Sequence, residues 1–144
     1  MTEETTNPEL TVYLRSSTPL PARDRQREVV TRAEQLARDG RIESVRVRRW
    51  EDRIVVSNGA DETVETFEAF KSRAAEIGHS IEPFFQEHER AETREIVFPI
   101  ICIAVHIDEE LRRVFPCRDE NEAYSVWDCL TALETDGKIV GLAD

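Results

Sequence analysis

Apolar and polar residues alternate along residues 10–15 and again along residues 42–50, so each segment is predicted to form a half-buried β-strand. Between them, residues 22–39 place apolar side chains along one helical stripe: Val29, Val30, Ala33, Leu36 and Ala37. Gly40 stands where helices often end in a left-handed residue. The pattern therefore predicts a strand, a helix and a second strand.

The second strand is followed by a short apolar stretch at residues 53–56. Glu51 and Asp52 predict a hairpin turn between the two, although the glycine that such turns favour is absent. A second helical stripe runs through residues 60–77, with Asp61 as its expected N-cap and Gly78 after its last turn. We therefore expect a hairpin followed by a helix.

The third quarter of the chain is predicted to contain the centre of the sheet. Residues 81–88 have an extended pattern, but Pro83 cannot donate a backbone hydrogen bond, which favours an edge strand or a bulge. The acidic stretch 87–95 is predicted to be an exposed loop. Residues 96–107 are the most apolar part of the chain, so from Ile100 onward we expect a strand buried on both faces.

Three consecutive acids, at positions 108–110, fit a polar hairpin turn after which residues 111–115 return antiparallel. The same cluster has the chemistry to bind a cation or to act as general acid and base. Ser125 and Asp128 have the spacing of a capping box, which predicts a helix that ends at Gly137. Residues 139–142 are expected to add a final strand.

The two strand-to-helix units match each other when the chain is shifted by 97 residues. Over positions 14–42 the identical pairs are Leu14/Leu111, Arg15/Arg112, Pro19/Pro116, Val29/Val126, Leu36/Leu133, Asp39/Asp136, Gly40/Gly137 and Ile42/Ile139. A true duplication explains this match, and so does convergence, because the same elements favour the same residue types.

The fold class that follows is α+β: a ferredoxin-like helix-on-sheet sandwich with two βαβ-like units and an inserted hairpin plus helix. Right-handed crossovers place both repeat helices on one face, and the helix at 62–77 is expected over the same face or over an end of the sheet. Residues 1–9 are predicted to be a flexible tail and residues 10–144 a single domain.

Composition narrows the class of protein. Hydrophobic residues are 40% and charged residues 34% of the 144, which excludes a disordered chain and a membrane protein. No apolar run approaches the roughly 18 residues of a spanning helix. Met1 is followed by polar residues rather than by a signal peptide, so we expect a cytoplasmic protein that does not bind membranes.

The net charge is −11, and 17 of the 19 basic residues are arginine. An acidic surface in which the weakly hydrated guanidinium replaces lysine is the pattern expected of a protein that works in concentrated salt, where self-repulsion is screened. A chance bias in arginine usage would give the same counts. The composition therefore favours a halophilic protein.

Basic residues are concentrated between Arg23 and Arg53, a segment that contains ten arginines and seven acidic residues. The candidate interaction or nucleic-acid patch within this region consists of Arg46, Arg48, Arg49, Arg53 and Trp50. The interleaved acids also fit ordinary pairing along a solvated helix, so both interpretations stay open. Trp50 is expected either to close the margin of the core or to stack on a base.

The three cysteines are odd in number and include no Cys-x-x-Cys, which argues against disulfides and a zinc cluster. Cys102 and Cys129 lie on apolar stripes and are predicted to be core residues. Cys117 follows Pro116 at the end of a strand and is the candidate reactive thiol. The three histidines lack metal spacing, and phosphate-binding and catalytic motifs are missing, so we expect no metal, no cofactor and no enzymatic activity.

Four segments carry a resemblance to a known group: Leu14-Arg15-Ser16 with Pro19, residues 36–42, residues 45–50, and Val114-Phe115-Pro116-Cys117. Over most of residues 11–136 the chain resembles small haloarchaeal proteins, some of which carry a helix-turn-helix label. The resemblance implies transcription-related DNA binding. Near residues 22–42, however, the sequence predicts one helix before the arginine-rich strand, whereas a helix-turn-helix needs two packed helices.

The leading functional hypothesis from the sequence is a non-enzymatic regulatory or protein-interaction module that meets a protein partner or forms a homodimer through a sheet edge. The alternative is a DNA-binding transcriptional regulator that uses the arginine-rich strand and hairpin. The net charge of −11 weighs against the alternative, because nucleic acid repels an acidic protein.

Overall fold

The computed structural model describes residues 7–56 and 61–135, which form an α+β fold. Its elements are β1 Glu9–Arg15, α1 Leu20–Arg38, β2 Ser44–Trp50, β3 Arg53–Val56, α2 Glu62–Glu76, β4 Gln86–Arg90, β5 Thr93–Val97, β6 Ile101–Ile107, β7 Glu110–Phe115, β8 Cys117–Arg118, β9 Ala123–Tyr124 and α3 Val126–Thr135. None of the helices described is long and apolar enough to cross a membrane.

A mixed sheet with the strand order β2-β1-β6-β7 lies at the centre. β1 pairs in parallel with β2 and antiparallel with β6, so that Val12 lies between Val47 and Ile103. β6 is buried on both faces over its first five residues, which confirms the prediction from its apolar sequence. The turn from β6 to β7 places Asp108 and Glu109 at positive φ, the backbone form that suits a tight hairpin and explains this acidic pair without chemistry.

The α+β class is confirmed, but a ferredoxin-like topology is not evident. In the split βαβ unit of that fold, a strand from the other half separates the two strands that flank a helix. Here β1 and β2, which flank α1, are directly hydrogen-bonded neighbours. The strand predicted at 139–142 lies outside the described residues, so the second unit is seen only as β7 and α3.

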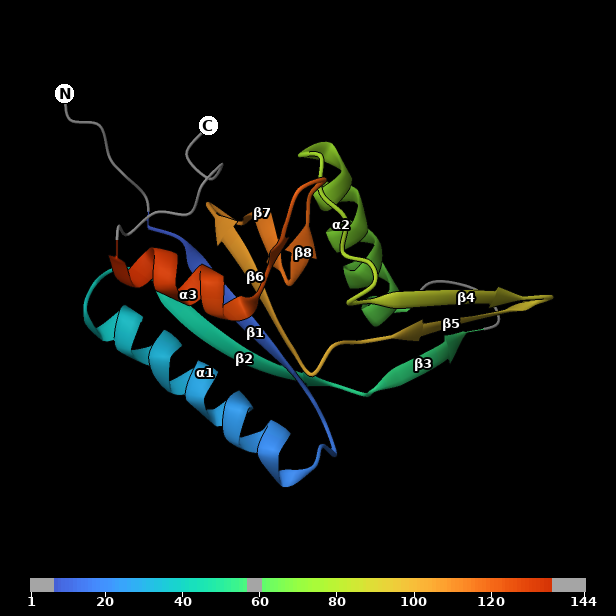
Figure 1. The fold of residues 1–144 in the computed structure, drawn as a ribbon, viewed down its shortest axis with the longest axis horizontal. Coiled ribbons are helices and arrows are strands. Elements are labelled where there is room, and N and C mark those ends of the chain that lie inside the picture. Colours follow the sequence, from blue (N-terminus) through green and yellow to red (C-terminus); the bar gives the residue numbers. More distant parts are fainter. Residues whose placement is uncertain (1–6, 57–60, 136–144) are drawn as a thin grey trace.

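Helices cover both faces of the central sheet. α1 and α3 pack side by side on one face, as predicted for the two repeat helices (Figure 1). α2 covers the opposite face, so its expected position on the same face or at an end was wrong. The reason is that the second face is also apolar, since Cys102, Ala104 and Val114 point toward Phe67 and Phe70 of α2.

The predicted hairpin between residues 42–50 and 53–56 is also wrong. β3 continues away from β2 and pairs with β5 in a second sheet of order β3-β5-β4 (Figure 1). A hydrogen bond from the Phe98 N–H to the Asp52 carbonyl, 2.9 Å long, holds the chain where the two sheets meet. Ile54 pairs with Ile96, so β5, which is distant in the sequence, takes the place of β2 as the partner of β3.

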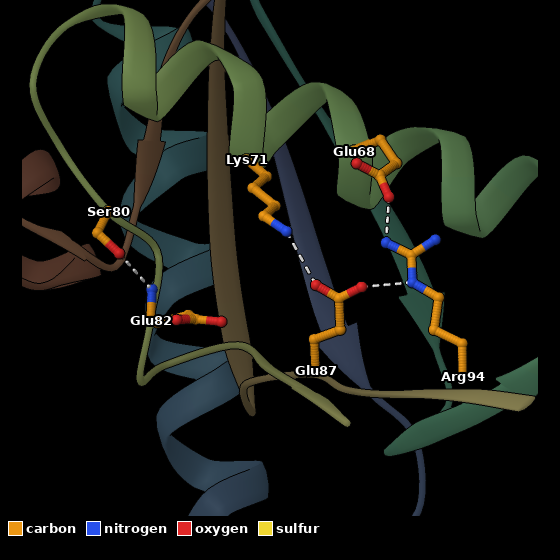
Figure 2. A network of polar contacts seen from close by, with 6 residues as sticks. All are labelled: Glu68, Lys71, Ser80, Glu82, Glu87 and Arg94. Carbon is orange, nitrogen blue, oxygen red and sulfur yellow. Dashed lines mark hydrogen bonds and ion pairs between the residues drawn. The ribbon is translucent and has the colours of Figure 1, made fainter. Parts of the chain in front are cut away.

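Residues 87–95 form a hairpin of β4 and β5, with Ala91 at positive φ in its turn, rather than the predicted loop. Its charges are paired with α2 in a network that Figure 2 shows: Arg94 contacts Glu68 and Glu87, and Lys71 Nζ lies 2.9 Å from Glu87 Oε1. This pairing lets an acidic segment form a strand. β4 is an edge strand as predicted, but it begins after Pro83, which lies in a turn.

The capping box of α3 is confirmed. The Ser125 N–H donates to Asp128 Oδ2 at 2.7 Å, and the Asp128 N–H donates to Ser125 Oγ at 3.2 Å. β1 and β7 are both strands and α1 and α3 are both helices, but residues 117–125, which the match sets against the first half of α1, form β8, β9 and the chain between them. The end expected at Gly137 lies outside the described residues, and both explanations of the match remain open.

Candidate nucleic-acid interface

The face of the sheet that carries α2 is only partly covered. An open groove with a volume of about 540 Å³ runs between this face and the first turn of α2. Its lining comes from β1, β2, β6 and α2: Thr11, Tyr13, Arg46, Arg48, Arg49, Trp50, Glu62, Thr63, Thr66 and His106. An adjoining hollow of about 360 Å³ shares Thr11, Arg46 and His106 with it, so the two form one trough along β2.

Strand alternation explains the basic side of the groove. Arg46 and Arg48 are two residues apart on β2 and therefore point to the same face, and Arg49, which alternation assigns to the other face with Val47, also lines the groove. All three arginines are exposed. Within residues 7–56 and 61–135, no carboxylate lies within 4.0 Å of their guanidinium groups, although eight ion pairs form elsewhere. These donors are therefore available to an external anion.

Trp50 forms part of the floor of the groove, but its ring belongs to the core. It stacks between Tyr13 and Phe98, with ring centroids 4.6 and 4.4 Å away, and is only 7% exposed. The structure therefore shows the first of the two predicted roles of Trp50, which is to close the margin of the core. A base would need to displace Tyr13 or Phe98 before it could stack on this ring.

Arg53 lies apart from the other members of the predicted patch. It begins β3 in the second sheet, and its Nη1 is 2.9 Å from Glu95 Oε2 on β5. Arg32 on α1 also forms an ion pair, with Glu134 on α3. The structure therefore brings together Arg46, Arg48 and Arg49 around the groove. The pairing along a helix that the sequence also allowed occurs between Arg27 and Asp24, whereas Arg32 and Arg53 pair with residues of other elements.

The rest of the groove was not found from the sequence. Thr11 lies on β1 and His106 on β6, and both reach the groove because β1 runs between β2 and β6. Burial lowers the pKa of His106, and Arg46 lowers it further, while Glu9 opposes this shift. Alternation along β1 and β6 assigns both residues to the face of Tyr13 and Cys102, which is the signal that a search of the sequence could have used.

Cys117 is buried at 1% exposure, and burial raises the pKa of its thiol despite the neighbouring Arg113. Its Sγ lies 3.8 Å from Nδ1 of His79, a partner far away in the sequence. A reactive thiol is typically exposed and has a lowered pKa, and the structure shows the opposite environment. The reactivity of Cys117 stays a prediction, and in the described part of the chain no three His, Cys, Asp or Glu residues cluster as a metal site.

Two histidines make stability depend on pH. Burial lowers the pKa of both His79 and His106 below the ordinary value of 6.5. The unfolded chain then takes up protons at a higher pH than the folded one, so the free energy of unfolding should fall as the pH decreases from about 7.5 to about 5.5. Urea denaturation across this range measures the slope.

The double variant His79→Gln/His106→Gln provides the control for this slope. It should flatten the dependence above pH 5.5, because carboxylates with lowered pKa values, such as Glu87 and Glu134, lose their contribution only at lower pH. A slope that is unchanged in the double variant would assign the pH dependence to other groups.

A family model described as Helix-turn-helix domain matches residues 2–138. The chain belongs to this helix-turn-helix domain family. The family description suggests DNA binding, in agreement with the resemblance found in the sequence. No curated protein and no solved structure matches the chain.

The described residues of this helix-turn-helix family member contain no two consecutive helices joined by a short turn. α1 is followed by β2, α2 lies between β3 and β4, and α3 follows β9. α1 and α3 pack together, but they come from opposite ends of the chain. The groove on the sheet is therefore a better candidate for a nucleic-acid contact in the described residues than a recognition helix.

Proposed function

We propose that this protein is a DNA-binding regulatory protein that contacts the phosphate backbone through Arg46, Arg48 and Arg49. The observation that carries the proposal is that these three exposed arginines line one groove and have no carboxylate partners among the described residues. The description of the family supports the same function. This reverses the preference from the sequence, which placed an interaction module first.

The position of the arginines on β2 suits a phosphate backbone. β2 is an edge strand of the central sheet, so a ligand can approach its side chains from outside the domain. Guanidinium groups donate paired hydrogen bonds that match phosphate oxygens, and such contacts fix a protein on DNA without reading its sequence. With a net charge of −11, the chain as a whole repels DNA, so binding has to rest on this local patch.

Arginine replacement in the groove tests this proposal. The triple variant Arg46→Gln/Arg48→Gln/Arg49→Gln should bind labelled duplex DNA at least about tenfold more weakly, and the slope of log K against log salt should become shallower by about 2 to 3. Fluorescence anisotropy over a series of KCl concentrations measures both quantities.

A matched control separates local contacts from overall charge. Arg23, Arg25 and Arg90 are exposed, lie outside the groove and take part in none of the ion pairs found in residues 7–56 and 61–135. Replacing all three by Gln removes as much positive charge as the groove variant does, but it should leave most of the affinity for DNA. Equal losses in the two variants, or no DNA binding by the unmodified protein at any salt concentration, would refute the proposal.

A protein-interaction function is the second candidate, and the exposed edge of β2 favours it. Val47 on this edge is 43% exposed, and the outer side of β2 pairs with no other strand of the described chain. Edges of this kind support pairing of two sheets in a homodimer. Light scattering across protein concentrations in molar salt tests it: a dimer is expected to be lost in Val47→Lys, and a strict monomer with no recoverable partner contradicts it.

A further inference from the structure

We propose that the groove between β2 and α2 is also a binding site for a small phosphate-bearing ligand, and that this ligand and DNA exclude each other because they share Arg46 and Arg48. The ligand-binding part stands on the geometry of the groove alone. The exclusion part rests on the proposed DNA-binding function.

The dimensions of the groove fit a small ligand. Its volume of about 540 Å³ lies within the range of roughly 300 to 1,000 Å³ that is typical of small-molecule sites. The sheet forms its floor through Thr11 and Tyr13, and the first turn of α2 forms a wall through Glu62 and Thr63. A ligand that enters is therefore contacted from two elements that the aromatic core fixes in place.

The donors in the groove select for phosphate. Three arginines line it, and within the described chain none of the three forms an ion pair with a carboxylate. Guanidinium forks bind phosphate oxygens in pairs, which gives both charge and geometry. His106 lies beside Arg46, and its lowered pKa leaves the ring able to gain a proton when an anion binds.

The acids around the trough favour a small ligand over a continuous phosphate chain in its interior. Glu62 lines the main groove, and Glu9 and Glu109 line the adjoining hollow. A polymer that followed the trough would bring phosphates against these three carboxylates. A small ligand places its phosphate at the arginines and away from Glu62, while DNA reaches the same arginines only from the open edge of β2.

Isothermal titration of the full chain with inorganic pyrophosphate, ribose 5-phosphate and sulfate at constant ionic strength tests the site. Saturable binding of one of the two phosphate probes with a stoichiometry of one is expected, with sulfate at least about tenfold weaker. Tighter binding of pyrophosphate would indicate an inorganic phosphate as the ligand, and tighter binding of ribose 5-phosphate would indicate a phosphorylated organic molecule. No saturable binding of either probe at millimolar concentration, or equal binding of sulfate, would overturn the site.

Variants locate the ligand. Arg46→Gln/Arg48→Gln should weaken binding of the better probe at least tenfold, while the matched control Arg23→Gln/Arg25→Gln should not. Glu62→Gln should strengthen it severalfold, because it removes a repelling charge from the wall of the groove, and a gain of affinity cannot result from loss of folding. Equal affinities in the two arginine variants, or weaker binding in Glu62→Gln, would overturn the site.

Competition tests the exclusion. The bound probe should displace labelled DNA from the unmodified protein at concentrations near its own dissociation constant, whereas KCl of equal ionic strength should not. If no DNA binds, the proposed function fails and the ligand site is judged by titration alone. If DNA binds and the saturating probe leaves it bound, the exclusion fails and the proposed function stands.

Discussion

Replacing Trp50 by alanine should lower the free energy of unfolding by about 3–5 kcal/mol, the usual cost of removing a buried large aromatic side chain. Trp50 stacks on Tyr13 and Phe98 and meets Phe85 edge-on at 5.8 Å. It ends β2 at the point where the chain passes from the central sheet to β3, so its loss opens a cavity between two sheets. Urea denaturation followed by circular dichroism measures the loss.

Trp127 supplies a matched control for this result. It is the other tryptophan of the chain, is half-buried at the margin of the opposite core and has the Arg32 guanidinium 5.6 Å from its ring. Trp127→Ala should lower the free energy of unfolding by no more than about half as much as Trp50→Ala, because the ring of Trp127 buries less apolar area on folding. If the two variants are equally destabilised, the aromatic stack of Trp50 is not the anchor that its contacts indicate.

The first three elements were predictable because their signals are local. Two-residue alternation defined β1 and β2, and the helical stripe with Gly40 at positive φ defined α1. β3 was found at the right residues but given the wrong partner. A turn without glycine at Glu51 and Asp52 competes poorly with the pairing of Ile54 and Ile96, which no local pattern reveals.

Charged residues misled the prediction for β4 and β5. Residues 87–95 have the composition of a loop, and only the tertiary structure provides the cations of α2 and the hairpin that pair with Glu87. The position of α2 is a different case, because the predicted burial of β6 on both sides already implies a cover on each face of the sheet. A strand that is buried on two faces needs a cover on each, which would have placed α2 correctly.

The candidate site was half predictable for a similar reason. Alternation along one strand put Arg46 and Arg48 on one face, so the basic side of the groove followed from the sequence. Glu62 and His106 join them through the register of the sheet and the position of α2, which are long-range properties. Arg53 was grouped with them because the hairpin was assumed, and its separation follows from the failure of that hairpin.

Salt should stabilise this fold. The net charge is −11, and repulsion between surface charges acts over a Debye length of about 10 Å at 0.1 M salt but only about 3 Å at 1 M. The melting temperature should therefore rise by several degrees or more between 0.1 and 2 M KCl, which differential scanning calorimetry measures. The ion pairs of Arg94 oppose this trend only weakly, because Arg94 and Glu87 are partly buried and so less exposed to screening.

Two variants with opposite charge changes separate repulsion from the general effect of salt on apolar burial. Glu34, Glu89, Glu92 and Glu120 are exposed and lie outside the ion pairs of residues 7–56 and 61–135, so their replacement by Gln removes repulsion without breaking a pair. This variant should respond less to KCl, and the triple Gln variant of Arg23, Arg25 and Arg90 should respond more. If all three proteins show the same slope, apolar burial rather than charge repulsion controls the response, and the excess of acids has another purpose.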